Sequence, residues 1–417
     1  MPYTYGYEPN DSFNSKQIVQ AAVSRTFDSI FRDDFVPWSL RKRNHLSDFE
    51  PKLLDGQNWV NSLKIVQTEV DKPSTFKPLA GQVDESYNLT LSKDGHAKLS
   101  AVSSTGVLRG LETFSQLFYK HSGGPFWYTP SVPVDIRDFP KFPHRGVMMD
   151  VARNWFPVKD ILRTIDAMSW SKMNILHIHI TDSQSWPLVI PALPELAKKG
   201  AYRPDLVYTP EDIEHIQRYA ITRGVEVILE IDMPGHIGSV SLSQPELIVA
   251  YNEQPYYLWC AEPPCGAFKL NDAGVDKFLE TMFGDLLPRL QPFSAYFHTG
   301  GDELNANDST LDPGVGSNDT AVLQPLLQKF VETQHARIRK AGMVPMVWEE
   351  IPIDWAVNVG KDTVIQAWLG PDSVKNLTSQ GFKVIDSNYN FWVSRKTSRL
   401  HVAAKKMGEH FTNVSGI

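Results

Sequence analysis

The chain has 417 residues, 42% of them hydrophobic and 21% charged, which is typical of a globular enzyme with one large domain and a smaller one. A net charge of −7, without a basic stripe interleaved with aromatic residues, argues against a nucleic-acid partner. No run approaches the ~18 apolar residues of a membrane-spanning helix, so no membrane partner is expected.

Signals for the cellular compartment point in different directions. The first residues show neither the basic nor the apolar region of a secretory signal peptide. Cys260 and Cys265 could close a small loop, but two cysteines are too few for a disulfide scaffold and wrongly spaced for zinc. Six Asn-x-Ser/Thr triplets give weak support for secretion, and they begin at Asn10, Asn88, Asn307, Asn318, Asn376 and Asn413.

Residues 1–140 are predicted to form a small α+β domain. Apolar positions at helical spacing predict a helix over 15–35 and another over 103–118. Short alternating runs at 62–70 and 87–91 predict strands of an antiparallel sheet. A Gly-Gly-Pro break and a proline-rich link follow, and we take them as the domain boundary.

Residues 141–417 are predicted to form a (β/α)₈ TIM barrel, because buried strands and helices alternate there over roughly 250 residues. Thr209-Pro-Glu-Asp212 has the cap, the N1 proline and the N3 acid of a helix start. The eighth strand is apparently missing, and the seven visible strands lie at 144–151, 174–180, 225–231, 295–298, 344–348, 363–368 and 383–386.

Polar and aromatic residues follow these strands, at the barrel face where ligands bind. Arginine can bind sugar hydroxyls, carboxylates accept hydrogen bonds from them, and tryptophan packs against pyranose faces. Such a set predicts a sugar site without a metal or cofactor. Its members, in chain order, are Asp150, Arg153, His179, Asp182, Glu230, Asp232, His236, Asp302, Glu303, Trp348, Glu349, Glu350 and Trp368.

The central pair is Asp302 and Glu303, which follow a short strand and two glycines. Glycines permit backbone angles that other residues avoid, so the turn can deliver both acids to the barrel rim. Adjacent carboxyl groups resist ionising together, which favours one proton donor and one charged stabiliser. Glycoside cleavage uses such a pair.

Several candidates also have simpler interpretations. Arg153 could form a surface ion pair, and Trp348 and Trp368 could be core residues. At least one of Glu349 and Glu350 is expected in a solvated loop.

The pair His177 and His179 has two further interpretations. They could be interior residues hydrogen-bonded to neighbours, or they could begin the zinc site of a metal-dependent hydrolase. The zinc interpretation is weaker, because no later strand is expected to supply more histidine ligands.

Several motifs together resemble glycoside hydrolase family twenty, the β-N-acetylhexosaminidases, and the fungal branch most closely. The resemblance runs from roughly Leu99 to Trp392 and implies a small α/β domain before a catalytic barrel. The matching segments are His144–Arg153, Leu176–Pro187, Glu230–His236, His298–Glu303, Trp348 and Gln366–Trp368.

The resemblance implies substrate-assisted catalysis on oligosaccharides or glycans that end in N-acetylhexosamine. Glu303 would be the general acid and base, and Asp302 would hold the acetamide N–H and stabilise the oxazoline-like intermediate. Arg153 would bind sugar hydroxyls. The other implied roles are pocket walls (Trp348, Trp368) and supporting polar residues (Asp182, His236, His179, Asp232).

The resemblance also implies an extracellular or vacuolar, lysosome-like location, and it allows a homodimer. After Trp392 the sequence departs from the family pattern, in which Tyr-Leu-Asp and an eighth strand follow. The missing Tyr and Asp bind the acetamide carbonyl and a sugar hydroxyl in that family. We therefore keep a catalytically impaired, sugar-binding homologue as the alternative, and we expect open sheet edges at 383–386 and 146–150.

Overall fold

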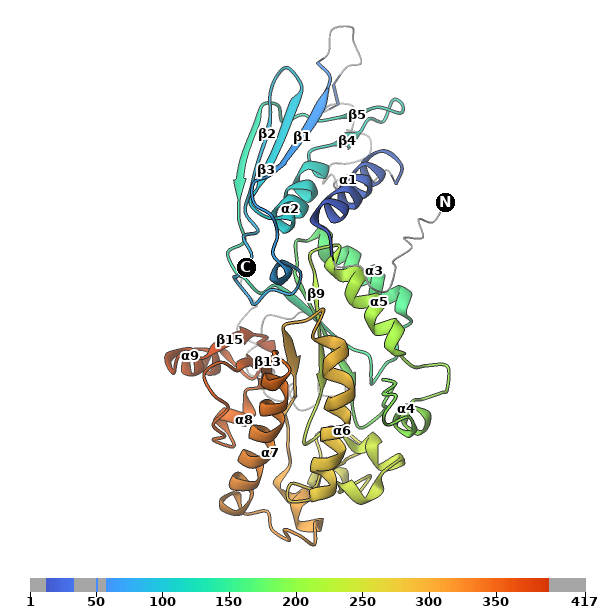
Figure 1. The fold of residues 1–417 in the computed structure, drawn as a ribbon, viewed down its shortest axis with the longest axis vertical. Coiled ribbons are helices and arrows are strands. Elements are labelled where there is room, and N and C mark those ends of the chain that lie inside the picture. The colour runs from blue at the N-terminus through green and yellow to red at the C-terminus, as the bar shows by residue number, and fades with distance from the viewer. Residues whose placement is uncertain (1–12, 34–49, 52–57, 390–417) are drawn as a thin grey trace, which may run out of the picture.

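The structure is a computed structural model that describes residues 13–33, 50–51 and 58–389. The expected departure after Trp392 and the triplets at Asn10 and Asn413 lie outside these residues. A smaller N-terminal domain packs against one end of a larger parallel barrel sheet (Figure 1).

The N-terminal domain is a four-stranded sheet in the order β1-β3-β2-β6, with two helices on one face (Figure 1). Its strands β2 and β3, and β2 and β6, pair in antiparallel fashion, as expected. Strand β1 instead runs parallel to β3, which an alternating pattern cannot reveal. The elements are α1 (Ser15–Phe31), β1 (Ser62–Gln67), β2 (Tyr87–Leu91), β3 (His96–Ala101), α2 (Ser104–Ser115) and β6 (Val134–Asp138), with the short η2 (Pro73–Phe76), β4 (Tyr119–Lys120) and β5 (Trp127–Tyr128).

The larger sheet has seven parallel strands in the order β15-β14-β13-β12-β9-β8-β7, a curled half-barrel that confirms the predicted strands. Within the described residues, β15 and β7 are the two end strands of the sheet, and each pairs with a single strand. The strands are β7 (Gly146–Asp150), β8 (Ile175–Thr181), β9 (Glu226–Ile231), β12 (Tyr296–His298), β13 (Val344–Trp348), β14 (Val364–Ala367) and β15 (Lys383–Asp386).

Helices connect these strands and cover the outside of the sheet (Figure 1). The predicted helix start forms a capping box, in which Thr209 Oγ1 accepts from Asp212 N–H and Asp212 accepts from Thr209 N–H. None of the described helices is long and apolar enough to cross a bilayer. The helices are α3 (Val158–Trp170), α4 (Glu195–Gly200), α5 (Pro210–Ile221), α6 (Ala273–Leu290), α7 (Thr320–Lys340), α8 (Glu350–Ile353) and α9 (Pro371–Ser379).

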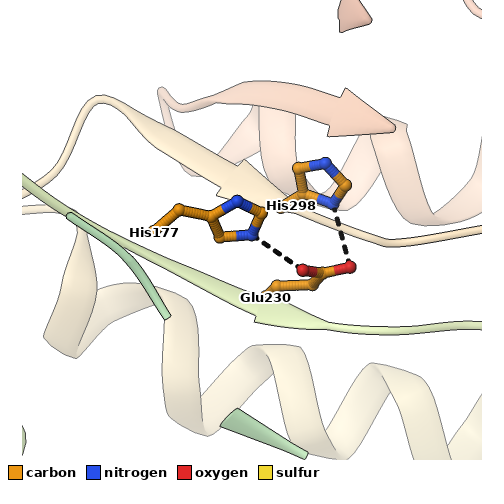
Figure 2. Close-up of side chains that lie close together, drawn as sticks. All are labelled: His177, Glu230 and His298. Carbon is orange, nitrogen blue, oxygen red and sulfur yellow. Dashed lines mark ion pairs between the residues drawn. The ribbon is translucent and has the colours of Figure 1, made fainter. Parts of the chain in front are cut away.

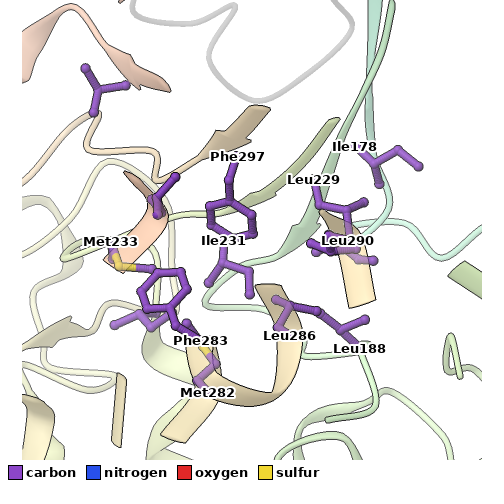
Figure 3. Packing of buried hydrophobic residues seen from close by; sticks show 14 of the residues in the cluster. Ile178, Leu188, Leu229, Ile231, Met233, Met282, Phe283, Leu286, Leu290 and Phe297 are labelled. Carbon is purple, nitrogen blue, oxygen red and sulfur yellow. The ribbon is translucent and has the colours of Figure 1, made fainter. Parts of the chain in front are cut away.

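Between the sheet and its helices lies the main hydrophobic core, which fixes the strand ends in place (Figure 3). Phe297 of β12 meets Phe283 of α6 edge to face, with ring centroids 5.5 Å apart. Leu229 and Ile231 of β9 are also fully buried here. Burial of each such side chain contributes about 1.5–3 kcal/mol, so the polar residues that follow these strands stand on a rigid base.

Candidate active site

The carboxyl ends of β7, β8, β9, β12, β13 and β14 bring the predicted polar residues to one mouth of the sheet. Arg153 follows β7, Asp182 follows β8, and Asp232 and His236 follow β9. Asp302 and Glu303 follow β12 and keep 15% and 18% of their side chains exposed, whereas Asp182 is fully buried. The two acids can therefore meet a ligand while their neighbours hold them in place.

A strained turn presents these two acids. Gly300 and Gly301 adopt φ of 66° and 101°, and Glu303 itself has φ of 54°. Positive φ is accessible to glycine but costly for other residues. The turn is fixed from below by Asp232, whose Oδ1 accepts the Gly301 N–H at 2.7 Å. A β-carbon on Gly300 would lie 1.7 Å from the same oxygen, and one on Gly301 would lie 2.4 Å from Ile351 Cγ1, so close packing requires both glycines.

Asp302 also has a carboxyl neighbour from another strand, Asp232. Burial and the charge of Asp302 raise the pKa of Asp232 well above its usual range. Asp232 therefore holds a proton more tightly than an ordinary carboxyl group does.

Asp182 is the centre of a buried charge network. Its Oδ2 lies 2.8 Å from Arg153 Nη2 and 2.7 Å from His179 Nε2, and its Oδ1 lies 3.4 Å from His236 Nδ1. Burial raises the pKa of Asp182, but the charges of His236 and Arg153 outweigh it and hold that pKa well below its usual range. A buried carboxylate is tolerated only when paired in this way.

His236 connects this network to the exposed acids. Its Nε2 lies 3.4 Å from Glu303 Oε2 and 3.9 Å from Asp302 Oδ2. Burial lowers the pKa of His236, but the charges of Asp182 and Asp302 outweigh it and raise that pKa well above its ordinary value. A cation therefore stands behind both acids.

The two predicted tryptophans occupy the next two strand ends. Trp348 is nearly buried, and its Nε1 donates to Glu230 Oε1 at 2.8 Å. Trp368 is half-buried, and its Nε1 donates to Glu350 Oε1 at 3.0 Å.

The expectation that Glu349 or Glu350 lies in a solvated loop is wrong, because both are buried. Glu349 accepts the backbone N–H of Trp368 at 2.8 Å and also that of Leu369. Burial and the charge of Asp302 raise the pKa of Glu350 to about 8. Two consecutive acids resemble a surface turn in sequence, and only the folded loop shows that they support a tryptophan.

The argument that no later strand supplies a histidine is also wrong, because His298 of β12 stacks on His177 with ring centroids 4.8 Å apart. His177, Glu230 and His298 form a set of metal-type donors (Figure 2). Nδ1 of His298 already accepts the Gly300 N–H at 2.9 Å, and burial lowers the pKa of His298 to about 3. The donor geometry therefore matches hydrogen-bonded interior residues, the other interpretation of His177 and His179.

Sequence reasoning missed Glu262, whose Oε2 lies 3.2 Å from Arg153 Nη2. The signal was the Cys260–Cys265 spacing, because these residues form a disulfide that closes the loop carrying Glu262. Asn305 and Asn307 fasten this loop by donating to the carbonyl oxygen of Leu258 at 2.9 and 3.1 Å. The loop thereby borders a small cavity beside Glu303, together with Trp259 and Asp308.

Fold and site together define a barrel protein of the class that binds ligands at the carboxyl ends of its strands. An arginine, two partly exposed acids and two tryptophans at this mouth match a carbohydrate.

The chain belongs to glycosyl hydrolase family 20. Residues 142–413 match its catalytic domain, and residues 3–117 match a domain described as beta-acetyl hexosaminidase like. The catalytic match runs past Trp392, after which we expected a departure from the family pattern.

Individual relatives are consistent with this family assignment. The chain is 41% identical to a beta-hexosaminidase of Arthroderma benhamiae over 91% of this chain and 64% of the relative. It is 34% identical to the human beta-hexosaminidase subunit beta over 81% of this chain and 60% of the relative. A chitobiase structure from Flavobacterium johnsoniae superposes with a TM-score of 0.70 at 26% identity, over 91% of this chain and 54% of that one. The chain thus spans about three-fifths of the length of these curated relatives.

Proposed function

We propose that this protein is a retaining exo-β-N-acetylhexosaminidase that uses the acetamide group of its substrate as the nucleophile. One observation carries the proposal: Asp302 and Glu303 lie on the same turn at the mouth of the sheet, with 15% and 18% of their side chains exposed. A charged acceptor beside a proton donor suits a substrate whose amide must be held in one orientation and must have its developing positive charge stabilised. Family membership supports the same reaction, in which no enzyme carboxylate attacks the sugar.

The reaction proceeds in two steps. Glu303 donates its proton to the glycosidic oxygen while the acetamide carbonyl oxygen attacks C1, so the C1–O bond to the leaving group breaks and an oxazolinium ring forms. Asp302 accepts a hydrogen bond from the amide nitrogen and balances the positive charge. Glu303, now a carboxylate, takes a proton from water, whose oxygen attacks C1 and reopens the ring with net retention.

Substrate binding uses the remaining mouth residues. Arg153, held by Asp182 and Glu262, presents its guanidinium to sugar hydroxyls. Trp348 and Trp368 form walls of the acetamide pocket, each oriented by a buried glutamate. Terminal N-acetylglucosamine, or N-acetylgalactosamine, is the substrate class that this pocket fits.

We also infer that the protein is a secreted or vacuolar glycoprotein. Its Cys260–Cys265 disulfide is of the kind that forms in oxidising compartments. Asn88, Asn318 and Asn376 are exposed and could accept glycans. A mass decrease on treatment with a peptide N-glycosidase tests the glycans, and light scattering tests the predicted homodimer.

Hydrolysis of chitobiose and of an aryl N-acetyl-β-glucosaminide tests the enzymatic proposal. We expect turnover, a β-anomer as the first product in proton NMR, and competitive inhibition by a thiazoline mimic of the intermediate. Binding of the thiazoline without turnover would instead support the catalytically impaired alternative. A first-formed α-anomer would reject the retaining mechanism.

A further inference from the structure

Strand β9 carries a carboxylate that the proposed reaction leaves unused. Glu230 is 0% exposed, so its carboxylate does not meet the sugar itself. It contacts side chains from three other strands: His177 and His179 of β8, His298 of β12 and Trp348 of β13. A buried charge with this many partners calls for an explanation, because removing such a group from water is expensive.

Each carboxylate oxygen has its own partners (Figure 2). Oε1 accepts the indole N–H of Trp348 at 2.8 Å. Oε2 lies 2.7 Å from His177 Nε2 and 3.1 Å from His179 Nδ1. His179 in turn contacts Asp182 through its other nitrogen at 2.7 Å. One carboxylate therefore joins the acetamide wall, Trp348, to the charge network that holds Arg153.

Neighbouring rings restrict the position of the Trp348 indole. His298 and His177 pack against it, with ring centroids 5.2 and 6.2 Å from that of Trp348. Burial raises the pKa of Glu230, but the three histidines outweigh it and hold that pKa well below its usual range. Hydrogen bonds to charged groups are the strong ones, so the charge of Glu230 favours a single orientation of the indole.

We propose that Glu230 is a positioning residue, which fixes the Trp348 indole through one oxygen and His179 through the other, and so sets the size of the acetamide pocket. This inference rests on the proposed function, because Trp348 must face the acetamide. It concerns selection among N-acyl groups: a fixed wall accepts N-acetyl and rejects longer acyl chains.

The test measures how well the protein distinguishes N-acetyl from N-butyryl sugars. Glu230→Gln keeps the shape but replaces one acceptor oxygen by an NH₂ group that cannot accept from a histidine. Trp348→Phe keeps a ring and removes the N–H. The matched control is Glu226→Gln, a buried carboxylate on the same strand that instead accepts from Ser294 and Ala295.

We expect the kcat/KM ratio of N-acetyl to N-butyryl aryl glucosaminide to fall about tenfold in Glu230→Gln and in Trp348→Phe, the loss typical of one hydrogen bond to a charged group. The double variant should fall no further, because both changes break the same contact. Glu226→Gln should keep the wild-type ratio. Affinities for free N-acetyl- and N-butyrylglucosamine, from calorimetry, give the same ratio without turnover.

A wild-type ratio in Glu230→Gln would overturn the inference, as would additive losses in the double variant. Equal losses of kcat/KM on both sugars would show that Glu230 has only a structural role. If Glu230→Gln does not fold, as judged by circular dichroism, a wild-type ratio in Trp348→Phe overturns the inference by itself. A wild-type chain that neither binds nor hydrolyses either sugar would reject the proposed function, and this inference with it.

Discussion

Replacing Gly300 by alanine should damage the turn that carries Asp302 and Glu303. The φ of 66° at this position costs an alanine about 1–2 kcal/mol. The new β-carbon would lie 1.7 Å from Asp232 Oδ1 and 2.6 Å from Asp232 Cα, so a rotamer change alone cannot relieve the overlap. Moving Asp232 away breaks its bond to the Gly301 N–H, which costs a further ~1–3 kcal/mol.

We therefore expect Gly300→Ala to lose about 2–5 kcal/mol of unfolding free energy, measured by urea titration. A shift of the acids by about 1 Å should also lower kcat/KM about a hundredfold. The control is Gly284→Ala in α6, where a β-carbon meets nothing within 4 Å and alanine should stabilise the helix by up to ~1 kcal/mol. A Gly300→Ala variant with wild-type midpoint and turnover would refute this view of the turn.

Further predictions concern the acids, the charge network and the sheet edges. Glu303→Gln should abolish cleavage of chitobiose, with a smaller loss on an aryl substrate, because acid catalysis worth about 10²–10⁴-fold matters most for a basic leaving oxygen; equal losses would reject its role. Asp302→Asn should slow both substrates alike, by about 3 kcal/mol of transition-state stabilisation, and weaken thiazoline binding; unchanged inhibitor affinity would separate it from the acetamide. The pKa of His236 is raised, so the stability that its charge contributes is complete below about pH 6.5 and is lost as the pH rises through the raised pKa. Above about pH 6.5 the wild type should therefore lose more unfolding free energy than Asp182→Asn in urea titrations, and parallel curves would contradict the pairing. An added apolar strand that pairs with β15 and β7 should reduce self-association in light scattering, and no reduction would show that these edges are harmless.

The sequence predicted the features that depend on local pattern. All seven barrel strands lie where buried runs were found, and the Thr209 capping box forms because its residues are neighbours in the chain. The residues proposed for the sugar site meet at one mouth because parallel strands place their carboxyl ends together. The parallel pairing of β1 with β3 was not predictable, because an alternating sequence pattern indicates a strand but not which strand it pairs with or in which direction.

Features that depend on tertiary contact escaped prediction. Glu349 and Glu350 are buried because Trp368 and its neighbours supply N–H donors, and nothing in their own segment indicates this. Burial and the charge of Asp302, which follows a different strand, raise the pKa of Asp232. Such couplings follow from distances between strands, which a single sequence does not contain.

The most direct test of the account varies the substrate and leaves the protein unchanged. Aryl glucosaminides with N-acetyl, N-fluoroacetyl, N-difluoroacetyl and N-trifluoroacetyl groups differ little in size but strongly in the nucleophilicity of the carbonyl oxygen. If the acetamide attacks C1 beside Asp302, kcat/KM should fall steeply and regularly across this series. Rates independent of the fluorine count would contradict the central claim, because a carboxylate or water would then be the nucleophile.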